Sequence, residues 1–315
     1  MNQQNKPCLP SKDKQCAFGI DIGGTEIKHS LISVDGRVIK HQSTSTPAKT
    51  TTMLKCLQQL IAQAMEVAIE KQLDLVGVGI GVPALVNNGV VVGGAENVPA
   101  LLGIDLKRSL QRYFDVPLYI ENDVQMVAVA EDRFGGAAEV DNVVFLTIGT
   151  GIGGAIKING NLYTGNGNGG TEIGHMIIKD GGKLCGCGST GCFQEYASVS
   201  ALVKYYCSLT NESPDKIDGK HIIQSYLRQE TKALIAMQWH FNYLAIGTAN
   251  LIKALSPQKV IIGGGISEAG ESYLEKLHQQ IAMIVHPIAM EDIKICRTLF
   301  GNRSGSIGAA ALAFS

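Results

Sequence analysis

The feature that most constrains the fold of this chain is a strand–glycine–strand unit that occurs twice. In each copy an apolar strand breaks at a run of glycines and resumes as a second strand, which a later turn folds into a third. The first copy occupies residues 18–22, 23–25 and 35–36, and the second occupies residues 143–148, 149–154 and 159–160. The later turns read Asp-Gly and Asn-Gly, which are strong hairpin signals. The repeat predicts two lobes of similar architecture.

The glycine runs indicate phosphate binding. A glycine turn between two strands lets backbone N–H groups approach an anion because no Cβ stands in the way. Two such turns facing each other could hold the two ends of a polyphosphate; the alternative is that the glycines only permit tight hairpins. A third run, at 263–265, follows an apolar strand and precedes a helical pattern, so it could support an adenosine group. The predicted nucleotide-binding residues are Asp21, Gly23, Gly24, Thr25, Gly149, Thr150, Gly151, Gly153, Gly264 and Gly265.

Other glycine-rich nucleotide sites fit the sequence poorly. A dinucleotide-binding fold places its glycines between a strand and a helix, and a Walker-type loop needs a lysine and a hydroxyl at the start of a helix. The two repeated runs lead into further strands instead. Neither pattern is therefore present in them.

Composition and charge argue against several classes of partner. The 315 residues are 45% apolar and 17% charged, which is ordinary for a globular protein, and the net charge is −1. This balance gives no electrostatic reason to expect nucleic acid or an anionic membrane, and no apolar run approaches the ~20 residues of a membrane span. The stretch before Cys16 lacks the apolar core of a secretion signal. We expect a cytoplasmic protein with small polar ligands.

The remaining patterns alternate between strands and helices, which predicts an α/β fold. The expected elements are helices at 53–68, 124–133 and 231–255 and strands at 75–82 and 117–120. The buried face expected for the last helix consists of Leu234, Phe241, Leu244, Thr248, Leu251 and Leu255. We place the boundary between the lobes near residue 121. Residues 1–15 then form a flexible N-terminus, 16–121 the first lobe and 122–299 a larger second lobe.

Three polar residues, Glu121, Asn122 and Asp123, follow the expected strand at 117–120 and precede a helix. The carboxyl end of a strand is where an α/β sheet presents side chains to a ligand. A carboxylate beside a bound nucleotide can accept the proton of a hydroxyl that is being phosphorylated, so Asp123 is the candidate general base. The alternative is that Asn122 or Asp123 only caps the helix.

The most specific local pattern is a histidine followed by three closely spaced cysteines. His175, Cys185, Cys187 and Cys192 supply one imidazole and three thiolates, which complete a tetrahedral zinc set. Four protein ligands leave no open position, so the zinc would be structural; the alternative is a chance cluster of reduced thiols. Glu172 lies three residues before His175, so on a helical turn the two side chains share a face.

Together these motifs resemble the ROK family of repressors, open reading frames and kinases. The matching segments, in the family's order, are 21–25, 121–123, 149–154, 172–175 and 185–192. The resemblance implies a two-lobed, actin-like ATPase fold of the ribonuclease H-like, hexokinase type, with residues from about 300 to 315 packing back on the first lobe. It also implies ATP- and Mg²⁺-dependent phosphorylation of a hexose or N-acetylhexosamine, usually at the 6-hydroxyl.

The resemblance also implies roles for individual residues. Asp123 matches the family's general base, and His175 matches a residue that binds both the sugar and zinc. The predicted substrate-binding residues are Asn97, Asn122, Asp123, Glu172, His175 and Gln194. Gln194 stands where the family commonly has glutamate, with Glu195 one position late, and an amide lacks the charge-assisted bond of a carboxylate. We therefore expect Gln194 to influence which sugar is preferred.

Other functions within the resemblance stay open as alternatives. A DNA-binding repressor of the family carries a helix-turn-helix before the first motif, whereas the segment before residue 16 contains Pro7 and Pro10 and lacks helical spacing. Further alternatives are an inactive sugar-binding module, a kinase for a β-glucoside, and a kinase that uses polyphosphate as donor. We expect a sugar and ATP as partners, neither nucleic acid nor membrane, and a homodimer.

Overall fold

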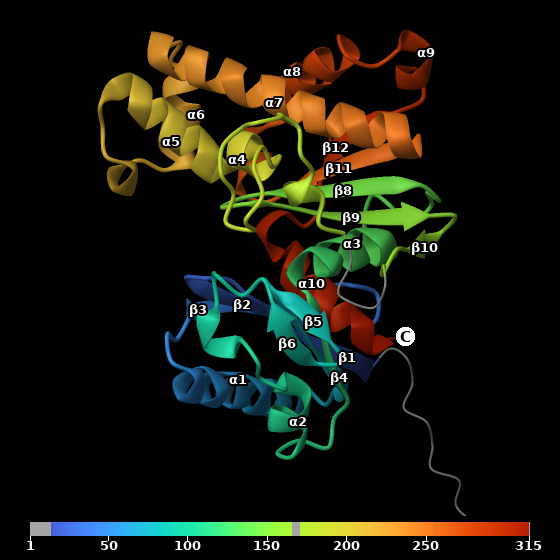
Figure 1. Ribbon diagram of the computed structural model, residues 1–315. Helices are drawn as coiled ribbons and strands as arrows, with labels where there is room; N and C mark the ends of the chain where they lie inside the picture. The colour runs from blue at the N-terminus through green and yellow to red at the C-terminus, as the bar shows by residue number, and fades with distance from the viewer. Residues whose placement is uncertain (1–13, 166–170, 315) are drawn as a thin grey trace, which may run out of the picture. The chain divides into compact units, whose positions relative to one another are not determined.

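The computed structural model describes residues 14–165 and 171–314 and divides them into two compact units (Figure 1). Unit 1 consists of residues 14–130 and 305–314, and unit 2 consists of residues 131–165 and 171–304. The chain first passes between the units within the helix Asp123–Phe134, later than the predicted boundary near residue 121. The flexible N-terminus predicted for residues 1–15 lies outside the described residues up to residue 13.

Unit 1 is built on a five-stranded sheet in the order β3-β2-β1-β4-β7. The first three strands are antiparallel neighbours, whereas β4 pairs in parallel with both β1 and β7. The sheet strands are β1 Gln15–Ile22, β2 Glu26–Ser33, β3 Val38–Ser45, β4 Asp74–Val82 and β7 Leu118–Asn122, and β5 Leu85–Asn87 pairs separately with β6 Val90–Gly93. The helices are α1 Thr50–Glu70, α2 Leu106–Gln111, the first part of α3 Asp123–Phe134, and α10 Ser304–Ala311.

Unit 2 repeats this plan with the order β10-β9-β8-β11-β12. Again three antiparallel strands are followed by two parallel ones. The strands are β8 Val143–Ile148, β9 Ile152–Ile158, β10 Asn161–Leu162, β11 Lys259–Gly263 and β12 Lys294–Arg297. The helices are α4 Gln194–Ala197, α5 Val199–Thr210, α6 Gly219–Leu227, α7 Thr231–Leu255, α8 Glu271–Ala282 and α9 Pro287–Met290. The predicted α/β class with a repeated strand unit is confirmed.

The predicted hairpin turns connect the expected strands. Gly36 lies between β2 and β3 with φ 82°, and Asn159 and Gly160 lie between β9 and β10 with φ 50° and 78°. Left-handed φ values at both central residues are the requirement that makes Asn-Gly favourable in such turns. The local sequence signal and the backbone therefore agree.

Helix α7 begins and ends at the predicted residues, but its buried face is broader than expected. Leu234 and Leu255, predicted to be buried, are only half-buried, whereas Met237 and His240 are buried. A long helix that packs against several neighbouring elements buries residues on more than one of its faces. The periodicity of its apolar residues therefore does not predict which residues near its ends are buried. Among residues 14–165 and 171–314, no helix is both long and apolar enough to cross a bilayer.

The C-terminal helix α10 lies directly on the backbone of the unit 1 sheet. A Cβ built on Gly19 of β1 would lie 1.8 Å from the carbonyl oxygen of Ser306, and one on Gly79 of β4 would lie 1.8 Å from that of Ala309. The Ser30 and Ser306 hydroxyls, 2.8 Å apart, form a buried hydrogen bond between β2 and the same helix. The helix can approach this closely only because the sheet has glycine at both contacts.

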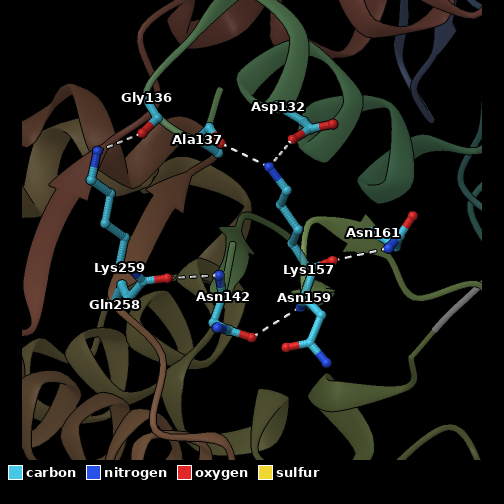
Figure 2. A network of polar contacts seen from close by, with 9 residues as sticks. All are labelled: Asp132, Gly136, Ala137, Asn142, Lys157, Asn159, Asn161, Gln258 and Lys259. Atoms are coloured by element: carbon cyan, nitrogen blue, oxygen red, sulfur yellow. Dashed lines mark hydrogen bonds and ion pairs between the residues drawn. The ribbon is translucent and has the colours of Figure 1, made fainter. Parts of the chain in front are cut away.

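Buried polar groups anchor the segment that follows α3 within unit 2 (Figure 2). The Lys157 ammonium is 5% exposed; it contacts Asp132 at 2.5 Å and donates to the carbonyl of Ala137 at 3.0 Å. Lys259 donates to the carbonyl of Gly136 at 2.6 Å. The buried Glu131 carboxylate accepts the backbone N–H groups of Gly136 (3.0 Å) and Leu299 (2.7 Å). These bonds tie together the two stretches of chain at which unit 2 begins and ends.

We predict that Gly79→Ala destabilises the protein. The added methyl group would overlap a backbone carbonyl of α10, so the helix must shift, and overpacking of this kind costs about 1–3 kcal/mol in the free energy of unfolding. Urea denaturation measures the change. Gly93→Ala is the control, because its Cβ would meet nothing closer than 3.7 Å; an equal loss in both variants would contradict the packing argument.

Candidate functional site

Two carboxylates lie at one edge of the unit 1 sheet, where β1 and β7 end. Asp21 is the penultimate residue of β1, and Asp123 is the first residue of α3, directly after β7. Asp21 and Glu121 are both paired with Gly81 of β4, and a Cβ on Gly81 would lie 3.5 Å from the Cα of Asp123. Both aspartates are half-buried. The fold therefore brings the predicted base and the first glycine motif together.

The environment raises the pKa of both carboxyls. Burial raises the pKa of Asp123 to about 7, and the negative charge of Asp21 acts in the same direction. Burial also raises the pKa of Asp21 to about 6, although the Lys28 ammonium lowers it. Since neighbouring like charges disfavour double ionisation, the pair titrates near neutral pH. A carboxylate with a pKa near neutrality is suited to general base catalysis.

Asn122 caps helix α3. Its Oδ1 accepts the backbone N–H groups of Val124 at 3.0 Å and Gln125 at 3.4 Å, and its Nδ2 donates to the carbonyl of Ala84 at 3.2 Å. The Asp123 carboxylate accepts from Val124 at 2.9 Å through Oδ1. The capping role that was the alternative for this pair thus belongs to Asn122, which orients the helix that carries Asp123.

Gly305 of α10 is a contact of Asp21 that the sequence motifs do not predict. A Cβ built on Gly305 would lie 2.3 Å from Oδ2 of Asp21, so only glycine lets the start of α10 lie against this carboxylate. The signal in the sequence is the run of small residues in α10, SGSIGAAA, which is typical of a helix in close backbone contact.

The first glycine turn leaves two exposed residues at the end of β1. The Gly23 N–H donates to the carbonyl of Glu26 at 2.9 Å, and the Thr46 hydroxyl donates to the carbonyl of Gly23 at 2.7 Å. Gly24 and Thr25 are exposed. A Cβ on Gly24 would lie 3.2 Å from the carbonyl oxygen of Asn97, which places this predicted sugar-binding residue beside the turn.

The second and third glycine runs meet at the end of β8 in unit 2. The Gly149 N–H donates to the carbonyl of Gly151 at 3.0 Å, and Thr150 is exposed. Gly264 has φ +84°, and a Cβ there would lie 2.4 Å from the carbonyl oxygen of Ile148. Gly265, by contrast, has open space around its Cα. All three predicted nucleotide-binding segments thus lie beside strand ends, and the turn at 149–151 lies next to Gly264 and Gly265.

His175 and the three cysteines converge as the zinc hypothesis requires. Their ligand atoms all lie within 4.8 Å of one another, with His175 Nδ1 at 3.5 Å from Cys185 Sγ and Cys187 Sγ at 3.6 Å from Cys192 Sγ. A tetrahedron with Zn–S bonds of about 2.3 Å has edges of about 3.8 Å, so the spacing fits zinc. Burial raises the pKa of Cys192 to about 12, which leaves a neutral thiol unless a cation joins the cluster.

The two ring nitrogens of His175 face different groups. Nδ1 faces the cysteines, whereas Nε2 lies 3.6 Å from Oε2 of Glu172. The predicted proximity of Glu172 and His175 is therefore present: His175 ends the short 3₁₀ helix Ile173–His175, and Glu172 directly precedes this helix. A metal on Nδ1 would fix the ring and with it the position of Nε2 relative to Glu172.

Gln194, the first residue of α4, extends toward the cysteine cluster. Its Nε2 donates to Cys185 Sγ at 3.5 Å. Its neighbour Glu195 is instead joined to the loop through its backbone, because its carbonyl accepts from the Lys183 ammonium at 3.3 Å. The structure thus places Gln194, rather than Glu195, beside the predicted metal ligands.

We predict that Asp123→Asn stabilises the protein above neutral pH. The folded-state pKa of Asp123, about 7, exceeds the ordinary value near 3.9, so the folded state binds this proton more tightly. The contribution of Asp123 to the free energy of unfolding is therefore fully present below about pH 4, where the carboxyl is protonated in both states. This contribution is lost as the pH rises through about 7. The amide cannot ionise and should gain about 1–3 kcal/mol of unfolding free energy at pH 8 relative to wild type, and little at pH 4.5.

Urea denaturation of both proteins at the two pH values measures this gain. Asp115→Asn is the matched control, because Asp115 is an exposed aspartate of the same unit. A difference between wild type and Asp123→Asn that is the same at both pH values would contradict the raised pKa.

Comparison with known proteins gives a consistent assignment. Residues 17–315 match the ROK family. A glucokinase from Thermotoga maritima is 30% identical over 306 residues, which cover 94% of this chain and 96% of that protein. A xylose repressor from Bacillus subtilis is 30% identical over 314 residues, which cover 98% of this chain and 79% of the repressor.

Solved structures agree with the sequence relatives. A ROK family glucokinase from Streptomyces griseus, in complex with glucose and AMPPNP, has a TM-score of 0.81 and 29% identity. The similarity covers 94% of this chain and 98% of that one. The chain therefore belongs to the ROK family and has its two-lobed, actin-like ATPase fold.

Proposed function

We propose that this protein is an ATP-dependent sugar kinase that phosphorylates a hexose or N-acetylhexosamine at the 6-hydroxyl. The observation that carries the proposal is the Asp21–Asp123 pair, in which a carboxyl with a pKa of about 7 begins a helix beside a glycine turn. The glucokinase relatives, and the glucose and AMPPNP bound to the Streptomyces griseus enzyme, support a sugar and ATP as ligands.

Asp123 is the general base in this proposal. Its carboxylate accepts the proton of the sugar hydroxyl while that oxygen bonds to the γ-phosphorus of ATP. The bond from the γ-phosphorus to the bridging oxygen breaks, and ADP leaves with that electron pair. The capping bonds of Asn122 and the bond from Val124 to Asp123 Oδ1 hold the carboxylate in place for this transfer.

Phosphate binding is assigned to the glycine turns at 23–25 and 149–151, in which Gly24, Thr25 and Thr150 are exposed, together with Gly153 of β9. Gly264 and Gly265 are assigned to the adenosine group. Asp21 would hold Mg²⁺, for which a carboxylate together with phosphate oxygens is the usual ligand set. Bound Mg²⁺ would neutralise charge on the phosphates during transfer.

Sugar binding is assigned to Asn97, Asn122, Glu172, His175 and Gln194 together with Asp123. The four residues His175, Cys185, Cys187 and Cys192 would hold a structural zinc, which supplies rigidity to the loop that carries Glu172 and Gln194. The distances within the cluster support this assignment. The predicted homodimer stays a prediction.

The kinase proposal is tested with a panel of free hexoses and N-acetylhexosamines, ATP and Mg²⁺, with sugar phosphates identified by mass spectrometry. We expect at least one sugar to be phosphorylated. Asp123→Asn should lower kcat by at least ~10²-fold, the lower end of what a positioned base contributes, with sugar binding retained. Asp115→Asn should match wild type.

Two results would contradict the proposal. Sugar binding without phosphoryl transfer to any sugar would favour a sugar-responsive regulator, as in the xylose repressor relative. Near-wild-type turnover of Asp123→Asn would remove this residue from the role of base.

We also predict one zinc ion per chain in protein purified without added metal. Elemental analysis measures it directly, and Cys192→Ser should lose most of the metal because a buried ligand is removed. Cys207→Ser, at a buried cysteine outside the cluster, is the control. Full activity with zinc content near zero would overturn the metal assignment.

A further inference from the structure

Gln194 lies between the cysteine cluster and the second glycine turn. Its Nε2 is 3.5 Å from Cys185 Sγ. On the other side of the amide, a Cβ built on Gly151 would lie 2.9 Å from Oε1, and one on Gly174 would lie 3.3 Å from it. One side chain therefore touches a predicted metal ligand and the backbone of a predicted phosphate-binding turn.

The backbone at Gln194 is held firmly on both sides. Phe193 is 0% exposed and packs against Gly247 of α7, where a Cβ would lie 2.3 Å from its ring. After α4, the N–H of Val199 donates to the carbonyl of Gly149 at 2.9 Å. The segment from Gln194 to Val199 thus meets the 149–151 turn at both of its ends.

The chemistry of the amide suits a metal-bound thiolate. An amide N–H can donate to a sulfur that carries negative charge, whereas a carboxylate has no proton to donate at neutral pH and would repel that sulfur. Groups that hydrogen-bond to metal ligands typically change metal affinity 10–100-fold. A glutamine at this position is therefore favourable for zinc binding in a way that glutamate is not.

We propose that Gln194 is a positioning residue that links the zinc cluster to the 149–151 phosphate-binding turn. The proposal rests on the zinc and nucleotide assignments made above. The hydrogen bond from the amide N–H to Cys185 stabilises the metal site. The oxygen of the same amide lies against Gly151, so a well-ordered metal site also restricts the conformations of the 149–151 turn. This role is additional to the sugar contact assigned above, because the bond to Cys185 uses only one of the two N–H groups of the amide.

The primary test is the rate at which zinc passes from the folded protein to a coloured chelator, 4-(2-pyridylazo)resorcinol. Gln194→Glu should release zinc at least ~10-fold faster than wild type, because the carboxylate faces the thiolate. Gln194→Met, which keeps the length without donor or charge, should release it faster than wild type but more slowly than Gln194→Glu. Gln224→Glu, on the exposed surface of α6, is the matched control and should not change the rate.

A second readout tests the link to the turn. In Gln194→Met, with zinc still bound, the KM for ATP should rise severalfold while kcat changes less. Unchanged zinc release in both Gln194 variants would overturn the proposal whatever happens to the sugars. So would a changed KM for sugar with unchanged zinc release and unchanged KM for ATP. Absence of zinc from the wild-type protein would overturn it together with the metal assignment, whereas zinc without kinase activity would leave the release test intact.

Discussion

The candidate base depends on one close contact, the packing of α10 against the glycines of the unit 1 sheet. At Gly19 and Gly79 the helix backbone meets the sheet backbone, and at Gly305 it meets the carboxylate of Asp21. The start of α10 therefore lies directly against the Asp21 carboxylate. Burial raises the pKa of both groups, and the negative charge of Asp21 raises that of Asp123 further, so that Asp123 can accept a proton near neutral pH.

The two units stabilise their functional loops by different means. In unit 1 the loops are fixed by backbone packing, which requires glycine and permits little variation. In unit 2 the proposed zinc ligands would fix the loop from His175 to Cys192, and Gln194 lies between that cluster and a glycine turn. Ile177 and Leu184 in this loop are exposed, so apolar burial contributes little to its stability. Bound metal would supply the stabilisation instead.

Much of the fold was predictable because its signals are local. The hairpin turns at Asp35-Gly36 and Asn159-Gly160 can be predicted because they contain residues that tolerate a positive φ. Helix α7 can be predicted from the periodicity of its apolar residues. The cysteine cluster was predictable because ligand type and spacing are chemical signals. The contact of Gly305 with Asp21 was not, because a residue without a side chain gives no pattern that identifies its partner far away in the sequence. Periodicity also could not show that Asn122, rather than Asp123, caps α3.

The proposed base depends on the raised pKa of Asp123, which is caused by burial and by the charge of Asp21. The most direct measurement is a carboxyl titration by NMR of protein labelled with ¹³C at the aspartate side chains, with Asp123→Asn used to assign the resonance. We expect Asp123 to titrate near pH 7 and Asp21→Asn to shift this midpoint to lower pH, because the like charge is removed. Titration near pH 4 in the wild-type protein, unchanged by Asp21→Asn, would contradict it.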